Sequence, residues 1–233
     1  MNLADFEQLV LNRRATRHFR PDPVSRETLD HLLEIARWAP SGYNIQPTHF
    51  VVVMDEKLKS ALYPICMDQS QILEAPAIVI FAGDRKSAEN NFEKALAMDL
   101  VEGAITLDYA KKLQGFVDLA FRQGPLGFNW LVKALLVPLV RIFRPIPMIP
   151  AVYKRFWVDK QVMLVAMSFM LAASAAGLAT VPMEGFDEGK LKKLFGIPSN
   201  FTVPVIVPVG YSAEGNLKKT RLPLKDILHR NSW

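Results

Sequence analysis

Helical and strand-like hydrophobic spacing alternate along the first half of the chain. Apolar residues after Ser25 recur every three or four positions, as on one face of a helix: Leu29, Leu32, Leu33 and Ala36. Ser25 is a favourable N-cap and Pro40 cannot continue a helix, so we predict a helix that ends near residue 39. Residues 1–14 also read as an amphipathic helix, and not as a secretory signal.

Four short apolar runs predict strands. Residues 49–54 (HFVVVM) and 77–82 (AIVIFA) have the composition of strands that are covered on both faces. Residues 203–209 (VPVIVPV) predict a third strand, at an edge or irregular because Pro204 and Pro208 cannot donate to a ladder. Residues 177–181 are the candidate fourth strand, and residues 86–113 read as helical.

Residues 161–183 contain no charged side chain before Glu184, so their length alone is compatible with a membrane span. Their centre, residues 172–177 (AASAAG), is only weakly hydrophobic and suits close helix packing. We therefore predict a buried helix, in the core or at a dimer interface.

Residues 115–157 mix large apolar side chains with six basic residues and one acid, Asp118. Five prolines interrupt the segment, and no apolar run in it reaches the length of a spanning helix. It reads as an insertion between two globular portions. It would form a lid or packing layer, or alternatively an element that lies on a membrane surface.

Composition and charge exclude several classes of protein. Half of the 233 residues are hydrophobic and 22% are charged, which excludes intrinsic disorder. The single cysteine excludes a disulfide scaffold and favours a cytoplasmic location, and four scattered histidines give no metal motif. A net charge of +5 supports anionic ligands and gives no reason to expect a nucleic-acid partner.

Four short motifs carry candidate chemistry. Residues 13–17 (RRATR) gather three guanidinium groups, which suit a phosphate group or form a solvated helix end. Residues 39–47 (APSGYNIQP) form a polar loop, residues 182–186 (PMEGF) allow close backbone approach at a glycine, and residues 219–221 (KTR) form a second basic cluster. No dinucleotide-binding, phosphate-loop or nucleophile-elbow motif is present.

The order of these motifs resembles the nitroreductase family of FMN flavoproteins. RRATRHF, ARWAPSGYNIQPTHFVVV, PMEGFD and VPVIVPVGYSAEGNLKKTRLPL follow one another at the family's intervals. The likeness covers roughly residues 3–85 and 160–229. It implies these FMN-binding positions: Arg13, Arg14, Arg17, Pro40, Ser41, Gly42, Asn44, Asp68, Gln71, Pro182, Met183, Glu184, Gly185, Lys219 and Arg221.

The resemblance also assigns a role to each group of positions. Arg13 and the basic cluster at 219–221 match phosphate ligands, and Arg14 matches a neighbouring flavin contact. Arg17 matches a cation near flavin N1 and the C2 carbonyl, where it would raise the reduction potential. Residues 184–185 match backbone amides that face N5 and O4. Ala15 replaces the family's usual serine, so one hydroxyl contact is missing.

Two further groups complete the implied site. Residues 40–44 match a loop that reaches FMN from the partner subunit. Asp68 and Gln71 match positions at the pyrimidine edge. No side chain is implied as a catalytic acid or base, because solvent can supply the protons.

The fold implied by the resemblance is α+β, a mixed sheet of four or five strands surrounded by helices in an intertwined homodimer. Residues 1–233 would form one FMN-binding domain that carries the insertion. The implied activity passes hydride from NAD(P)H through flavin N5 to a quinone or nitroaromatic acceptor. The alternatives are reductive dehalogenation, flavin fragmentation, a membrane-peripheral flavoprotein acting on lipid-soluble quinones, and a non-enzymatic basic protein that binds membranes.

Overall fold

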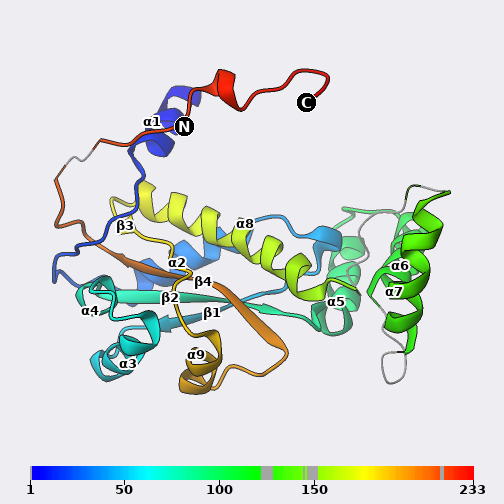
Figure 1. The fold of residues 1–233 in the computed structure, drawn as a ribbon, viewed down its shortest axis with the longest axis horizontal. Coiled ribbons are helices and arrows are strands. Elements are labelled where there is room, and N and C mark those ends of the chain that lie inside the picture. Colours follow the sequence, from blue (N-terminus) through cyan, green and yellow to red (C-terminus); the bar gives the residue numbers. More distant parts are fainter. Residues whose placement is uncertain (1, 122–127, 144, 146–151, 216–217) are drawn as a thin grey trace.

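A four-stranded sheet with the order β1-β2-β4-β3 forms the centre of the molecule (Figure 1). The computed structural model describes the chain except residues 1, 122–127, 144, 146–151 and 216–217. The strands are β1 (Thr48–Val53), β2 (Ala77–Asp84), β3 (Ala179–Thr180) and β4 (Phe201–Gly210). All four lie within two residues of the runs predicted from the apolar pattern, so the α+β class is confirmed.

The described strands pair antiparallel throughout. β1 pairs with β2 from Thr48 opposite Gly83 to Val53 opposite Ile78, and β4 pairs with both β2 and β3. The expected mixed character of the sheet is limited to an isolated parallel bridge between Ala15 and Thr180. This bridge fixes the chain that leaves the first helix against the end of the sheet.

The two prolines of β4 were expected to mark an edge or irregular strand. β4 is internal, so the edge is wrong, but its pairing with β2 is irregular at a register shift between Phe81 and Gly83. Ile206 exchanges backbone hydrogen bonds with Met183, and the Pro208 carbonyl accepts from Val181. Because alternate residues direct their backbone groups to the same side, Pro208 faces away from β2, as Ile206 does. That side is paired only with the very short β3 and an isolated bridge, so the missing N–H group of Pro208 breaks few ladder bonds. Pro204 lies where the register between β2 and β4 shifts, between the pairs Phe81–Val205 and Gly83–Thr202.

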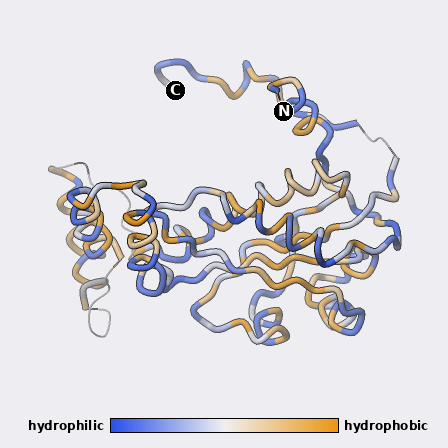
Figure 2. The backbone as a smooth tube through the Cα atoms, turned by 180° about the vertical axis from the view of Figure 1, so that it is seen from behind, coloured by the Kyte–Doolittle hydropathy of each residue, from blue (hydrophilic) through white to orange (hydrophobic). Residues whose placement is uncertain are grey.

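Helices cover both faces of the sheet (Figure 1). Their bounds are α1 (Leu3–Asn12), α2 (Arg26–Ala36), α3 (Glu56–Leu62), α4 (Gln71–Glu74), α5 (Ser87–Val101), α6 (Leu107–Phe121), α7 (Phe128–Arg141), α8 (Lys154–Ala175) and α9 (Glu188–Phe195). Helices α2 and α8 share one buried apolar cluster with the sheet, and α3, α4 and α9 lie over the other. Figure 2 shows the hydrophobic strands between these two layers.

Local chemistry explains one helix start that was predicted and one helix end that was not. The Ser25 side chain accepts a hydrogen bond from the Thr28 backbone and caps α2, as expected. The stretch at 86–113 is two helices, α5 and α6, because the chain turns at Gly103 with a φ of +67°. A glycine adopts that conformation at little cost, and the second helix can therefore start in a new direction.

Helix α8 is the long apolar helix expected from residues 161–183, and it begins seven residues earlier. It packs against α2, β2 and β4, and its buried side chains include Val162, Ala166 and Phe169. Within the described part of the chain, α8 is the one helix whose length and composition would allow it to cross a membrane. Its packing in the core favours the predicted buried helix.

Helices α6 and α7 project from one end of the sheet (Figure 1). Phe121 is buried and makes edge contacts with Tyr43 and Trp157, whereas Phe116, Phe128 and Phe143 are exposed. The side chain of Trp130, another aromatic of this segment, lies outside the described residues. Helical structure between 115 and 157 is confirmed for α6 and α7, and the boundaries of an insertion stay a prediction.

Candidate flavin site

Cations from the two ends of the chain meet beside the C-terminal end of α1. The Lys219 ammonium donates to the Arg13 carbonyl at 2.7 Å. Burial, followed by the charge of Arg221, lowers the pKa of Arg13. Desolvation, followed by the charges of Arg13, Arg221 and Arg14, lowers the pKa of Lys219. The tertiary structure therefore collects the two basic clusters that are about 200 residues apart in the sequence.

Arg13 has unused hydrogen-bonding capacity in this cluster. Its Nη1 is buried and meets no hydrogen-bond partner among the described residues. A buried guanidinium nitrogen without an acceptor is costly, and like charges nearby increase the cost. An anion with several oxygens would satisfy Nη1 and neutralise the cluster, so these residues fit a phosphate group.

Arg14 is engaged differently from Arg13. Its guanidinium forms an ion pair with Glu214 and donates to the Gly215 carbonyl at 3.3 Å. The other oxygen of the Glu214 carboxylate accepts from the Arg17 backbone N–H at 3.0 Å. Glu214 was not selected from the sequence, because nothing local distinguishes it from a solvated acid. It holds the 13–17 segment in place and competes with any anion for Arg14.

A cavity of about 250 Å³ opens at this cluster between α1, the end of α8 and residues 212–215. Arg13, Arg14 and Thr16 line it, together with Ser174 and Gly177. Thr16 is buried, and its backbone N–H donates to the Thr180 carbonyl. Ala15 replaces the family's usual serine and has no hydroxyl group. The neighbouring Thr16 places a hydroxyl-bearing side chain in the cavity wall.

The loop at Pro182–Asp187 is fixed to the segment between α3 and β2. Met183 is buried and bridges to Ile206 of β4, whereas Pro182, Glu184 and Gly185 are exposed. The Asp187 backbone N–H donates to the Ile65 carbonyl at 3.0 Å. The backbone at 184–185 is thus accessible and rigidly placed, as a group that orients a ligand must be.

Gln69 connects the segment expected at the pyrimidine edge with the 184–185 backbone expected at N5 and O4. Its Nε2 donates to the carbonyls of Gly185 at 3.1 Å and Cys66 at 3.0 Å. Its Oε1 accepts from Gln71, which is buried, so the Gln71 amide serves this internal network. Asp68 is exposed and adopts a positive φ of 53°, as Met67 does beside it. Gln69 was missed because its role depends on contact with a loop 116 residues away.

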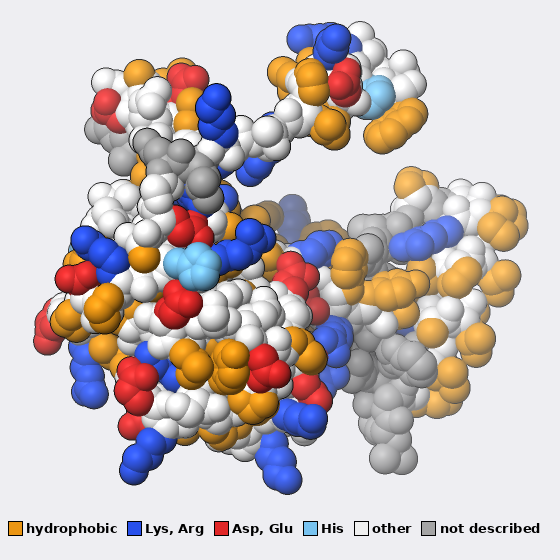
Figure 3. Space-filling view, turned by 60° about the vertical axis from the view of Figure 1, so that its left-hand side comes forward, with side chains coloured by type: hydrophobic (Ala, Val, Ile, Leu, Met, Phe, Trp, Pro, Cys, Tyr) orange, Lys and Arg blue, Asp and Glu red, His pale blue; other side chains and the backbone are white. Residues whose placement is uncertain are grey.

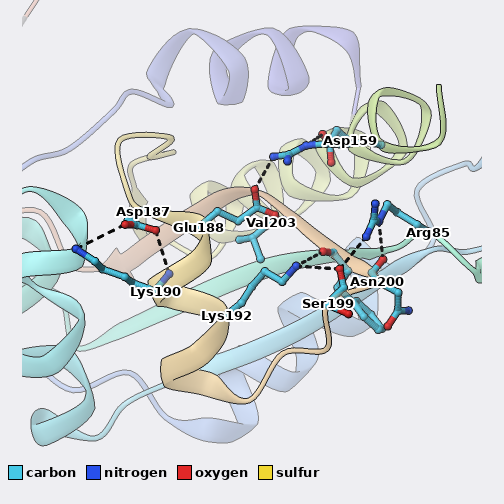
Figure 4. A network of polar contacts seen from close by, with 11 residues as sticks. Arg85, Asp159, Asp187, Glu188, Lys190, Lys192, Ser199, Asn200 and Val203 are labelled. Carbon is cyan, nitrogen blue, oxygen red and sulfur yellow. Dashed lines mark hydrogen bonds and ion pairs between the residues drawn. The ribbon is translucent and has the colours of Figure 1, made fainter.

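A polar network holds the same loop from its other side (Figure 4). Arg155 on α8 forms an ion pair with Glu188, and the Glu188 carboxylate accepts from the Val203 backbone N–H at 3.1 Å. The Asp187 side chain caps α9 by accepting from the Lys190 backbone N–H. Between these groups lies a cavity of about 550 Å³, whose walls include Glu184 and Phe156. It is the space beside the 184–185 backbone that a flat ligand could enter.

Asp159 lies in the wall of that cavity. Burial is the main reason why the pKa of its carboxyl is raised, and the charge of Glu188 acts in the same direction. Arg155, with its Nε 3.6 Å from the carboxylate, and Thr202 act in the opposite direction. The Asp159 carboxyl in this wall is therefore easier to protonate than an ordinary aspartate, a feature that the sequence motifs did not indicate.

The loop at residues 40–46 has an unusual backbone. Tyr43, Asn44 and Gln46 all have positive φ angles near 50°, which are uncommon for residues other than glycine. The Asn44 amide donates to the Asp99 carboxylate at 3.0 Å, and the Gly42 N–H donates to the Gln161 side chain at 2.8 Å. These contacts hold the conformation, and such held strain is typical of functional loops.

This loop and the cationic cluster lie at opposite ends of α8. The loop contacts Gln161, and the cavity at the cluster reaches Ser174. Thirteen helical residues separate these positions by about 20 Å. In the described structure, no hydrogen bond joins the loop to the cluster or to the Pro182–Asp187 loop. One subunit therefore does not bring residues 40–44 together with the cationic cluster.

Comparison with known proteins decides the family. The sequence pattern of the nitroreductase family matches residues 10–211, most of the chain. The chain belongs to the nitroreductase family. The recognition made from the four ordered motifs is thereby confirmed.

Relatives match along almost their whole length. An NADH dehydrogenase of Thermus thermophilus is 28% identical over 224 residues, covering 96% of this chain and 95% of that protein. The oxygen-insensitive NAD(P)H nitroreductase of Salmonella typhimurium is 27% identical over 235 residues, covering 96% and 98%.

Solved structures show the same fold. A nitroreductase-like protein of Streptococcus mutans has a TM-score of 0.75 at 22% identity, covering 98% of this chain and 99% of that chain. A protein of Exiguobacterium sibiricum, solved in complex with FMN, has a TM-score of 0.73 at 23% identity, covering 99% of each chain. The nitroreductase fold expected from the sequence is confirmed.

Proposed function

We propose that this nitroreductase-family protein passes hydride from NAD(P)H, through bound FMN, to a quinone or nitroaromatic acceptor. The observation that carries the proposal is the buried, unpartnered Arg13 Nη1 within a cluster that also contains Lys219 and Arg221. These three residues are the ones that match the family's phosphate ligands. The oxidoreductase class and the use of NAD(P)H, expected from the sequence, are confirmed by the family and its relatives. The FMN complex of the Exiguobacterium sibiricum protein supports the expected cofactor.

Each part of the site has a distinct task in this proposal. When bound, FMN supplies the two-electron chemistry. Arg13, Lys219 and Arg221 hold the phosphate, and the exposed backbone of Glu184 and Gly185 orients the reactive edge of the ring. The Gln69 amide supports that backbone through the Gly185 carbonyl. The protein thus contributes binding and orientation, and solvent supplies protons.

We propose a homodimer in which each site uses residues 40–44 of the partner subunit. The open face of α8 carries exposed Phe156, Leu164 and Met167, which a symmetric copy would cover. A two-fold axis across α8 places the N-terminal end of one helix beside the C-terminal end of the other. The 40–44 loop of one copy would then approach the cationic cluster of the second, which closes the separation of about 20 Å.

The terminal arms support an intertwined arrangement. Helix α1 exposes Leu3 and Leu11, and the C-terminal arm at 218–233 exposes Leu222, Leu224 and Trp233. Both arms extend away from the body of the molecule (Figure 1). A partner subunit is the expected cover for these side chains, and the proposed location of the dimer is the cytoplasm.

The proposed function is tested by the visible spectrum and the turnover of the purified protein. We expect a yellow protein whose flavin band bleaches when NAD(P)H is added without oxygen and returns when a quinone or nitroaromatic is supplied. Steady oxidation of NAD(P)H with these acceptors separates a reductase from a flavin-fragmenting enzyme, which would turn over poorly. A colourless protein that stays colourless with added FMN contradicts the proposal.

Lys219 gives the site a predictable pH dependence. Its pKa in the free protein is lowered by desolvation and by the neighbouring arginines, whereas a bound phosphate stabilises the protonated form and raises it. FMN affinity should therefore be full below the free-state pKa and fall as pH rises through it. Titrating FMN between neutral and alkaline pH should show this loss in the native protein.

The variant Lys219→Met is the control for that titration. It should bind FMN more weakly and with a flatter alkaline pH profile. An unchanged alkaline profile in Lys219→Met would assign the titration to another group and remove Lys219 from the phosphate site.

A further inference from the structure

Asp159 is an acidic side chain at the boundary between the protein interior and a cavity. It lies on α8, in the wall of the cavity of about 550 Å³ that also includes Glu184. Its side chain is 25% exposed, whereas its Oδ1 atom is buried. Figure 4 shows Asp159 on α8, near Glu188. The carboxyl group therefore borders both the interior and the space that a flat ligand could enter.

The interior side of this carboxyl group offers little to stabilise a negative charge. Asp159 Oδ1 has no hydrogen-bond partner of normal geometry among the described residues, and neither has Oγ1 of the buried Thr202. The Thr202 hydroxyl still acts to lower the pKa of Asp159, so the two groups are neighbours. Because a carboxylate with an unsatisfied buried oxygen is costly, this arrangement favours the protonated form.

The charged residues of the cavity wall do not neutralise Asp159. Arg155 Nε lies 3.6 Å from its carboxylate, but the Arg155 guanidinium also pairs with Glu188. Lys160, the other cation of the wall, is engaged over an aromatic ring, 4.9 Å from the ring centre. Glu184 and Glu188 add negative charge, and β4 contributes no charged residue to the wall in the described structure. The balance of these groups does not favour an ionised carboxylate.

These near groups, and not a surface field of one sign, set the protonation of Asp159. Figure 3 shows acidic and basic side chains intermixed over the body of the molecule. Exposed charges more than about 10 Å apart are also largely screened at ordinary salt concentrations. Burial is the main cause of the raised pKa of Asp159, and the charge of Glu188 adds to it. Asp159 therefore keeps its proton at a higher pH than an exposed aspartate does.

The shared cavity supplies the contact that an acid needs with its substrate. A general acid must come within hydrogen-bond reach of the group that it protonates. Glu184 belongs to the backbone that, in the proposed function, orients the reactive edge of the flavin. The same cavity has Asp159 in its wall. An acceptor beside that backbone is thus held in a space that a protonated carboxyl borders.

We propose that Asp159 is the proton donor to the acceptor in this cavity, a role that rests on the proposed reductase function. A quinone gains two electrons and one proton as hydride from bound FMN, which forms one O–H bond. A second O–H bond forms at the other quinone oxygen as the O–H bond of the Asp159 carboxyl breaks. The product is a hydroquinone, and Asp159 is left ionised. Since its side chain is partly exposed, it regains a proton from solvent, which remains the source of protons over the complete cycle.

The variant Asp159→Asn separates proton donation from hydride transfer. The rate at which NAD(P)H bleaches the flavin band should not change, because that step needs no proton from Asp159. Reoxidation by a quinone should slow about 100-fold below the pKa of Asp159, since a general acid contributes about 10²- to 10⁴-fold. In the native protein this rate should fall as pH rises through that pKa, and the variant should lack the fall. Stopped-flow absorbance measures both steps.

Asp30→Asn is the matched control for this measurement. Asp30 is an exposed acid on α2 that lines a different cavity. Its substitution removes the same charge and should leave both steps and the pH profile unchanged. Equal slowing in Asp30→Asn would assign the effect to net charge and overturn the donor role.

A second variant tests the carboxyl group without removing it. Thr202→Val removes the hydroxyl that lowers the pKa of Asp159, so this pKa should rise and the fall in quinone reduction should move to higher pH. Infrared titration of the protein without FMN reports the protonated carboxyl directly. A carboxyl signal that titrates above the ordinary aspartate range should appear in the native protein, move up in Thr202→Val and be absent in Asp159→Asn.

Each other outcome decides against the donor. A quinone step and pH profile that Asp159→Asn leaves unchanged would overturn it, as would an infrared titration that the substitution does not alter. Loss of both steps together with FMN in a folded Asp159→Asn would show that Asp159 supports cofactor binding and not proton transfer. A native flavin that NAD(P)H bleaches and a quinone reoxidises without pH dependence would overturn the donor alone. A native flavin that NAD(P)H does not bleach would contradict the proposed function and the donor with it.

Discussion

Replacing Arg13 with alanine is expected to weaken FMN binding by about 10- to 150-fold. The substitution removes a charge-assisted hydrogen bond to phosphate, and such bonds contribute roughly 1.5–3 kcal/mol each. It also removes the buried Nη1 that has no other acceptor among the described residues, so the free protein loses little stability. The dissociation constant, measured by flavin fluorescence at fixed salt, should rise while the melting temperature without FMN changes little.

Arg221→Ala should weaken binding by a similar factor, because Arg221 is the neighbouring charge that most affects Arg13. Arg26→Ala is the matched control, since Arg26 is an exposed cation at the start of α2, on a different surface. Unchanged flavin retention in both Arg13→Ala and Arg221→Ala after dialysis would remove the phosphate assignment. Equal weakening in Arg26→Ala would indicate a general effect of net charge.

Replacing Leu164 with glutamate is expected to convert the proposed dimer to monomers and to abolish stable FMN binding. Leu164 is 46% exposed on the open face of α8, where symmetry would place each substitution in the interface twice. Burying an unpaired carboxylate costs roughly 3 kcal/mol or more, so the dimer should dissociate at low micromolar concentration. Sedimentation velocity reports the mass of the particle, and its flavin absorbance reports the cofactor in the same run.

The two readouts separate two parts of the proposal. A monomer that retains FMN would contradict the contribution of residues 40–44 from the partner subunit. A wild-type protein that is already monomeric would exclude the dimer itself. Leu58→Glu is the control, because Leu58 is similarly exposed but lies on α3, across the sheet from α8. It should leave both the mass and the flavin content unchanged.

The strands and most helices could be predicted from the sequence because their signals are local. Residues 77–82 are continuously apolar, and the structure places β2 in the middle of the sheet with every residue buried. Ser25 and Pro40 limit α2 through bonds within a few residues of themselves. The position of β4 could not be predicted in this way. Its prolines indicate only a missing ladder bond, and the neighbouring strand decides whether that bond was needed.

Some residues of the candidate site could be predicted from the sequence, and others could be found only in the tertiary structure. Motif order indicated Arg13, Lys219 and Arg221, and the fold brings Lys219 to the Arg13 carbonyl. Glu214 and Gln69 carried no signal, because a single acid or amide acquires a role only from the groups that fold against it.

The sequence by itself determined the family, the α+β class and the basic and polar residues from which a phosphate site is built. These depend on local patterns and on the order of motifs along the chain. Only the tertiary structure decided that Arg13 keeps a buried nitrogen unpartnered and that Arg14 is paired with Glu214. It also decided that the 40–44 loop lies at the other end of α8 from the cationic cluster. The physical reason is that burial, pairing and separation depend on contacts between segments that are far apart in the chain.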